Sequence, residues 1–96
     1  MKIKVTAEHI YEGLKPGINP LGGCIVALAI KDALKLYTAF AASQDCVAVA
    51  MSHAYVYNHL IRLPEEVAWI IRNAYPANLM NRVIPLPFEF ELDYTP

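Results

Sequence analysis

Residues 20–35 read PLGGCIVALAIKDALK, and this stretch decides how the rest of the chain has to be arranged. From Cys24 to Ile30 every side chain is apolar, and polarity returns only at Lys31. A helix that is apolar on all sides is a buried helix. We therefore expect a helix running roughly from Pro20 to Lys35, packed between a sheet and a second layer.

The composition is unusually apolar for a chain of 96 residues, which is the length of a single domain, residues 1–96. Apolar residues make up 56% and charged residues 18%, whereas soluble domains average about 45–50% and 25%. A small protein has much surface and little interior, so some apolar side chains must be covered from outside. The sequence thus predicts a homo-oligomer or an obligate partner.

A membrane is the competing explanation for this composition, and segment length argues against it. The longest stretches without a formal charge are residues 16–30 and 46–61, shorter than the roughly 18 apolar residues of a spanning helix. The two cysteines, Cys24 and Cys46, lie in apolar runs and suggest small buried side chains in a reducing cytoplasm. The net charge of -1, without a basic run, argues against a nucleic acid polymer as partner.

Hydrophobic periodicity predicts an α+β fold with the element order β-α-α-β-β-α-β. Alternation predicts a strand over residues 2–5, and Thr6 suits the N-cap of a short helix over residues 7–14. Further strands are expected over residues 46–51, 54–57 and 88–94, with one more short strand over 60–63 as an option. One antiparallel or mixed sheet of about four strands, with helices on one face around the buried helix, accommodates these elements.

The two ends of the chain are predicted to be neighbouring strands. Residues 88–94 alternate between apolar side chains and the acids Glu89, Glu91 and Asp93, while the first strand presents Lys2 and Lys4. Pairing them sets lysines opposite glutamates, and each such pair contributes roughly 0.2–1 kcal/mol.

Several segments resemble a set of small uncharacterised bacterial and phage proteins: IKVTAEHI (3–10), CIVALAI (24–30), LPEEV (63–67) and PFEFEL (87–92). In those proteins a strand ending in Val-Thr precedes a Cys-x-Cys or Cys-x-x-Cys and then PVALA. Here only Cys24 is present and Ile25 stands in place of the proline, so a paired-cysteine metal or redox role does not transfer. The resemblance implies a phage or mobile-element setting and an accessory protein that blocks host defence.

All four glycines lie between residues 13 and 23, together with Pro16 and Pro20, and predict a loop before the buried helix. Backbone N–H groups at a helix N-terminus, with Gly22 and Gly23 allowing close approach, suit a phosphate, and Lys15 adds charge. The spacing matches neither a Walker loop nor a dinucleotide fingerprint. A compact loop whose glycines only satisfy turn geometry explains the same residues.

A helix that begins near Pro64 carries a second candidate. Its core stripe has helical spacing and consists of Val67, Ile70, Ile71 and Ala74. Trp69 then lies on the opposite, polar side beside Arg72, and both residue types are favoured at protein interfaces. The alternative is that residues 76–87 fold back and cover Trp69 within the same chain.

A third candidate combines Tyr55, Tyr57 and Arg62 with the nearby His53 and His59. Aromatic rings beside a cation can stack on a base or hold a phosphate. Tyrosines two positions apart are also what a half-buried strand prefers, so core or edge packing is the simpler explanation.

No catalytic residue, metal site or cofactor is predicted. Cys24 lies in the most apolar stretch, where a thiol is hard to ionise. The scattered histidines and the two distant cysteines lack metal-ligand spacing.

Three functions follow as hypotheses. The first is a non-catalytic, homo-oligomeric binding protein that counteracts host defence by sequestering a phosphate-bearing nucleotide signal near Lys15, Gly22 and Gly23, with Arg62 or Arg72 contributed by a neighbouring subunit. The second is a module that masks a host protein through a Trp69-centred surface. The third is a small nucleotide hydrolase.

Overall fold

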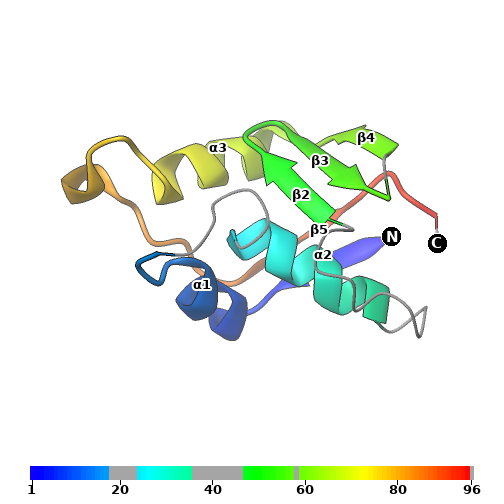
Figure 1. Ribbon diagram of the computed structural model, residues 1–96, viewed down its shortest axis with the longest axis horizontal. Coiled ribbons are helices and arrows are strands. Elements are labelled where there is room, and N and C mark those ends of the chain that lie inside the picture. The colour runs from blue at the N-terminus through cyan, green and yellow to red at the C-terminus, as the bar shows by residue number, and fades with distance from the viewer. Residues whose placement is uncertain (18–23, 36–46, 58, 96) are drawn as a thin grey trace.

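The helices and strands form an α+β arrangement (Figure 1). The computed structural model describes residues 1–17, 24–35, 47–57 and 59–95. Its helices are α1 (Ala7–Gly13), α2 (Ile25–Lys35) and α3 (Glu65–Ala74), followed by the 3-10 turn η1 (Leu79–Asn81). Its strands are β1 (Lys2–Val5), β2 (Val47–Ala50), β3 (His53–Val56), β4 (His59–Arg62) and β5 (Phe88–Glu91). Gly22, Gly23 and Cys46 lie outside the described residues. β4 takes the place of the strand that was optional in the predicted order, over residues 60–63, and begins one residue earlier.

The predicted neighbourhood of the two terminal strands is confirmed. β1 and β5 pair antiparallel, with Lys2 opposite Glu91 and Lys4 opposite Glu89. The closest side-chain approach is diagonal, since Lys2 Nζ lies 3.6 Å from Glu89 Oε1. Both side chains are more than half exposed, so solvent screens this ion pair and it adds little stability.

The remaining strands form a separate antiparallel sheet in the order β2-β3-β4. The turn between β2 and β3 comes one residue earlier than expected, at Met51 and Ser52, and β3 is therefore His53–Val56. Met51 and Tyr57, at the two turns, have the positive φ values 49° and 48°. Side chains seldom adopt this left-handed conformation outside Gly and Asn, so neither residue type marks the position at which β2 turns into β3.

The expected single sheet is instead two sheets, because α2 packs against strands of both. It contacts β1 of the first sheet, β2 of the second and also α1 (Figure 1). Ile25, Ile30 and Leu34 of this helix are fully buried, while Leu28 is only partly buried. A helix that lies between the two-stranded and the three-stranded sheet keeps their strands from pairing with one another, so each sheet forms separately.

The core is one cluster in which both sheets and all three helices take part. Its largest fully buried side chains are aliphatic: Ile3, Val5, Ile25, Val26, Ile30, Leu34, Val47, Val56 and Leu92. Cys24 is buried with them, just before α2, where its Sγ accepts a hydrogen bond from Ala27 N at 3.4 Å. Burial raises the pKa of this thiol, and the backbone hydrogen bonds oppose the shift only in part.

α1 begins at the expected N-cap and is tied to α2 at its first turn. Thr6 Oγ1 accepts from His9 N at 3.4 Å, and His9 Nδ1 in return accepts from Thr6 N at 3.0 Å. Because Nδ1 is an acceptor, the ring proton is on Nε2, which donates to Asp32 of α2 at 2.5 Å. The capping box thus fixes the orientation of a side chain that joins the two helices.

α3 begins after Pro64 and buries Val67, Ala68, Ile71 and Ala74. Ile70, expected in the core stripe, is only partly buried, and Ala68 takes part instead. In the described part of the chain no helix reaches the length and apolarity that crossing a membrane requires.

Candidate functional site

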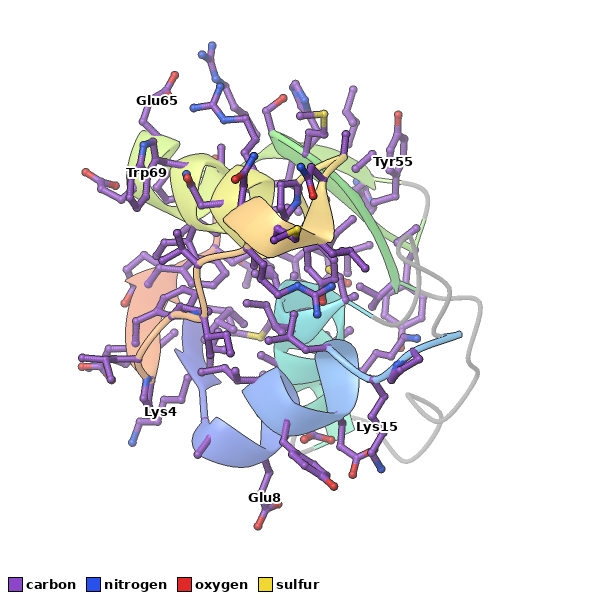
Figure 2. The ribbon with its side chains drawn as sticks, turned by 90° about the vertical axis from the view of Figure 1, so that its left-hand side faces the viewer. Lys4, Glu8, Lys15, Tyr55, Glu65 and Trp69 are labelled. Carbon is purple, nitrogen blue, oxygen red and sulfur yellow. The ribbon has the colours of Figure 1, made fainter. Side chains whose placement is uncertain are left out.

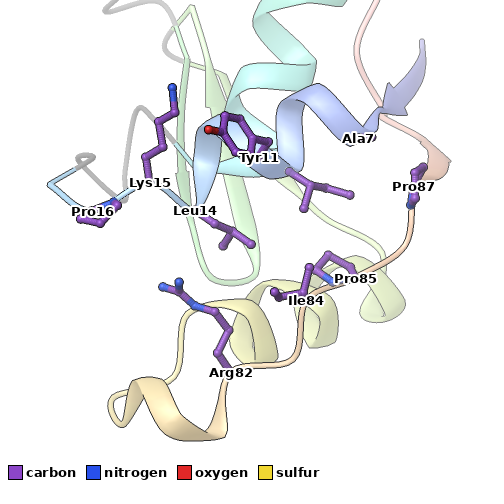
Figure 3. A pocket seen from close by; sticks show the side chains of 10 residues that line it. Ala7, Tyr11, Leu14, Lys15, Pro16, Arg82, Ile84, Pro85 and Pro87 are labelled. Atoms are coloured by element: carbon purple, nitrogen blue, oxygen red, sulfur yellow. The ribbon is translucent and has the colours of Figure 1, made fainter.

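A groove runs between α1 and the extended segment 82–87 that leads from η1 to β5 (Figure 3). It has a cavity volume of about 600 Å³. One wall comes from α1 and the residues after it: Ala7, Ile10, Tyr11, Leu14, Lys15 and Pro16. The other wall comes from the segment before β5: Arg82, Ile84, Pro85 and Pro87.

The α1 wall is held by a close contact with α2. A Cβ atom on Gly13 would lie 2.6 Å from Ile25 N and 2.9 Å from Ile25 Cα, so only glycine permits this approach. Tyr75, at the end of α3, adds two hydrogen bonds at the same place. Its hydroxyl donates to Gly13 O at 2.6 Å and accepts from Ile25 N at 3.0 Å. The end of α1 and the start of α2 are thereby joined through one phenol group.

The opposite wall is held against the end of α3. Val83 N donates to Asn73 O at 2.8 Å, and Arg82 Nε donates to Ala74 O at 2.9 Å. Pro85 and Pro87 restrict φ in the rest of the segment and lack an N–H group. The segment is therefore positioned by its first residues and stiffened by its prolines.

Arg82 is the charged group that enters the groove. Its side chain is partly buried, and Figure 3 shows the guanidinium pointing across the gap toward Leu14 and Pro16. Since Nε is bound to Ala74 O, the plane of the guanidinium is set and its two terminal nitrogens remain for other acceptors. Among the residues that the structure describes, no carboxylate forms an ion pair with Arg82.

The positive charge of Arg82 acts on the pKa of Tyr75. Burial raises the pKa of Tyr75 to about 12, and the hydrogen bond from Ile25 and the positive charge of Arg82 act in the opposite direction. The phenol is therefore neutral over the physiological range, which suits its role as donor to Gly13 O.

Among the predicted ligand residues that the structure describes, Lys15 alone lines the groove. Its Nζ lies 3.0 Å from Glu12 Oε1 and 5.0 Å from the centre of the Tyr11 ring. In Figure 3 its ammonium group points away from Arg82. The aliphatic stem of Lys15 thus forms part of the wall, while its charge is already paired with Glu12.

Of the other predicted ligand residues, Gly22 and Gly23 lie outside the described part of the chain. Tyr55, Tyr57 and Arg62 belong to the β2-β3-β4 sheet and its turns and do not line the groove. Tyr55 is exposed on the outer face of this sheet, between its cross-strand partners Ala48 and Leu60. Figure 2 shows Tyr55 and Lys15 at separate places on the molecule. Tyr57 is exposed at the turn after β3.

Arg62, the remaining candidate of this group, lies at the end of β4 and approaches Glu65. Its Nη2 is 3.6 Å from Glu65 Oε1, and both side chains are about three-quarters exposed. The described residues therefore do not gather Lys15, Tyr55, Tyr57 and Arg62 into one site.

Trp69 lies on α3 with 57% of its surface exposed, and Arg72 on the same helix is also exposed. Residues 76–87, the segment expected to cover Trp69 in the alternative interpretation, leave more than half of the side chain uncovered. Figure 2 shows Trp69 close to Glu65 at the surface of α3.

Two arrangements that resemble catalytic or metal sites have simpler roles. His9 and Asp32 form a pair, yet both ring nitrogens of His9 are engaged, by Thr6 and by Asp32, so no free lone pair remains for a general base. Within the described ranges, no group of three or more His, Cys, Asp or Glu side chains is placed to hold a metal ion.

No protein-family model, curated protein or solved structure matches the chain. The phage or mobile-element setting therefore stays a prediction.

Sequence reasoning missed the groove residues Tyr11, Arg82 and Ile84. A signal was present in the stretch RVIPLP (82–87), where a cation precedes apolar residues and two prolines. Such a stretch is stiff and cannot continue a helix, but nothing in it indicates that α1 lies opposite.

Proposed function

We propose that the protein is a non-catalytic binding protein that holds a small organic anion in the groove between α1 and residues 82–87. The observation that carries this proposal is Arg82, a partly buried guanidinium that points into an apolar groove and has no carboxylate partner among the described residues.

Among the described residues the Arg82 guanidinium gains one acceptor, Ala74 O, and partial burial of its remaining N–H groups without a carboxylate is unfavourable. An anion bound at the terminal nitrogens of Arg82 would relieve this cost, because guanidinium pairs with carboxylate or phosphate through two parallel hydrogen bonds. The volume of about 600 Å³ lies within the usual range of about 300–1,000 Å³ for small-molecule sites.

Sequestration through a homo-oligomer remains part of the proposal. Large apolar side chains are exposed on several elements, and Met80 and Leu86 are 92% and 83% exposed. A second copy of the chain would cover such surface. Whether the bound anion is a nucleotide signal of host defence stays a prediction that the same experiment addresses.

The test is native mass spectrometry of the protein purified from its host, followed by heat denaturation and mass analysis of whatever is released. A bound small anion that is recovered unchanged supports the proposal. Release of cleaved products would support the nucleotide hydrolase instead.

Arg82→Gln should lose the bound anion, whereas Lys4→Gln, which removes an exposed cation from β1, should keep it. If the two variants retain the anion equally, the proposal is wrong. It is also wrong if the wild-type protein carries no anion after purification and binds neither a nucleotide nor a carboxylate that is added to it.

The exposure of Trp69 favours a second candidate function, the masking of a host protein. A tryptophan beside an arginine on an exposed helix face is a frequent centre of interface energy. A pulldown with the immobilised protein from a host lysate should then retain one protein, identified by mass spectrometry. Trp69→Ala should abolish retention without changing the unfolding midpoint, and unchanged retention would exclude this function.

A further inference from the structure

On the basis of the proposed function, we infer that the ligand of the groove is an amphipathic monoanion, with one carboxylate at Arg82 and an unbranched apolar body along the walls. This names the class of molecule, which neither the charge nor the volume of the groove alone specifies.

The first argument is the number of positive charges available to a ligand. Among the ten lining residues only Arg82 and Lys15 are cationic. The ammonium of Lys15 is paired with Glu12 at 3.0 Å and turned away from Arg82. Glu12 also adds a negative charge next to this end of the groove. One cation therefore faces the ligand, which matches one negative charge better than the several charges of a nucleoside polyphosphate.

The second argument is the chemistry of the walls. Apart from Arg82 and Lys15, the lining consists of aliphatic side chains, three prolines and Tyr11. Ribose hydroxyls and base edges would lose water there and find few side-chain partners, and each unpaired polar group costs about 1–3 kcal/mol. An alkyl chain has no such groups and gains from every methylene that it buries.

The third argument is that the cation is held in place before binding. The hydrogen bond from Arg82 Nε to Ala74 O fixes the guanidinium, and the contact of Gly13 with Ile25 fixes the helix opposite. A site that is already ordered loses little conformational entropy on binding. A ligand whose carboxylate binds Arg82 would therefore extend its alkyl chain along Leu14 and Ile84.

Isothermal titration calorimetry with octanoate, decanoate, dodecanoate, 1-decanol, AMP and ATP tests the inference. Affinity should rise roughly three- to fifteenfold for every two carbons added to the chain, the upper value corresponding to full burial. Decanoate should bind at least tenfold more tightly than 1-decanol and than either nucleotide, because only decanoate combines the ion pair with an apolar body.

Two variants, each with a control, test whether decanoate binds in the groove. Arg82→Gln should weaken decanoate roughly tenfold or more, and Lys4→Gln should not weaken it. Ile84→Asp, at an exposed position in the wall, should also weaken decanoate by placing an anion there. Its control is Val83→Asp, since Val83 is similarly exposed but does not line the groove. Retained circular dichroism and unfolding midpoints show that the variants remain folded.

The outcomes separate the inference from the proposed function. If AMP or ATP binds in an Arg82-dependent manner and decanoate does not, the inference is wrong and the proposed function stands. If 1-decanol equals decanoate, or if Val83→Asp weakens binding as much as Ile84→Asp, the inference is also wrong.

If none of these anions binds, both the inference and the proposed function fail. If the protein is a dimer that Ile84→Asp dissociates and decanoate does not, a second copy of the chain occupies the groove, and this too would overturn the inference.

Discussion

The hydroxyl of Tyr75 donates a 2.6 Å hydrogen bond to the carbonyl oxygen of Gly13, 62 residues earlier in the chain. The phenolic oxygen of Tyr75 in turn accepts a hydrogen bond from the first backbone N–H of α2, that of Ile25, at 3.0 Å. One phenol thus satisfies a carbonyl at the end of one helix and an N–H at the start of the next, two groups that the helices themselves cannot pair.

Tyr75→Phe should therefore destabilise the protein by about 2–3 kcal/mol, because it leaves both backbone groups without their partner in a partly buried place. Urea unfolding followed by circular dichroism measures the change. Tyr55→Phe is the control, since Tyr55 is exposed on the β3 surface, and it should alter stability by less than about 0.5 kcal/mol. Equal effects of the two variants would contradict the assigned role of Tyr75.

The raised pKa of Tyr75 predicts a loss of stability in alkaline solution. Its pKa is about 12 in the folded protein and 10.0 for the reference phenol, so between these values the folded state binds more protons than the unfolded state. The contribution is fully present below pH 10 and disappears as pH rises through 12.

The measurement is the unfolding free energy from pH 9 to 12 for the wild type and Tyr75→Phe. Lysines and other tyrosines titrate in both proteins, but the wild type should fall more steeply. Parallel curves would show that the phenol does not contribute.

Gly13→Ala should destabilise the protein by about 2–3 kcal/mol, although alanine is the better helix former. The added Cβ would meet backbone atoms of Ile25, which cannot move without separating α1 from α2. Gly17→Ala provides the comparison, because Gly17 has open space around it and a φ of 80°. It should cost only about 1 kcal/mol of backbone strain. A smaller loss for Gly13→Ala than for Gly17→Ala would rule out the close contact.

Truncation of two large aliphatic residues should destabilise the protein to very different extents. Ile30→Ala should cost about 2–5 kcal/mol, because Ile30 is fully buried in α2 and its loss leaves a cavity. Leu86→Ala should cost less than about 0.5 kcal/mol, since Leu86 is 83% exposed. Urea unfolding curves of the two variants give both free energies from their midpoints and slopes. A large loss from Leu86→Ala would indicate that another copy or partner covers this side chain.

Several local features followed from sequence pattern alone. The alternation in residues 88–91 and 2–5 predicted the pairing of β5 with β1, and Thr6 predicted the N-cap of α1. The periodicity of α3 placed Trp69 on its polar side and left open whether residues 76–87 cover it, and the structure leaves 57% of it exposed. These features depend on a period of two or about 3.6 residues and on nearest-neighbour hydrogen bonds, which a sequence displays directly.

Other features were not accessible in this way. The β2-β3 turn uses Met51 at a positive φ, so its position had no glycine or asparagine signal. The division into two sheets depends on where α2 lies. The first binding hypothesis relied on Gly22 and Gly23, which lie outside the described residues.

The sequence by itself determined the α+β class, the apolar character of α2 and the pairing of the two terminal strands, because side-chain periodicity and charge alternation act over a few residues. Only the tertiary structure decided that Arg82 faces Leu14 across a groove and that Gly13 meets Ile25 and Tyr75. Those contacts join residues 12 to 68 positions apart, and their geometry comes from the packing of whole helices around a shared core.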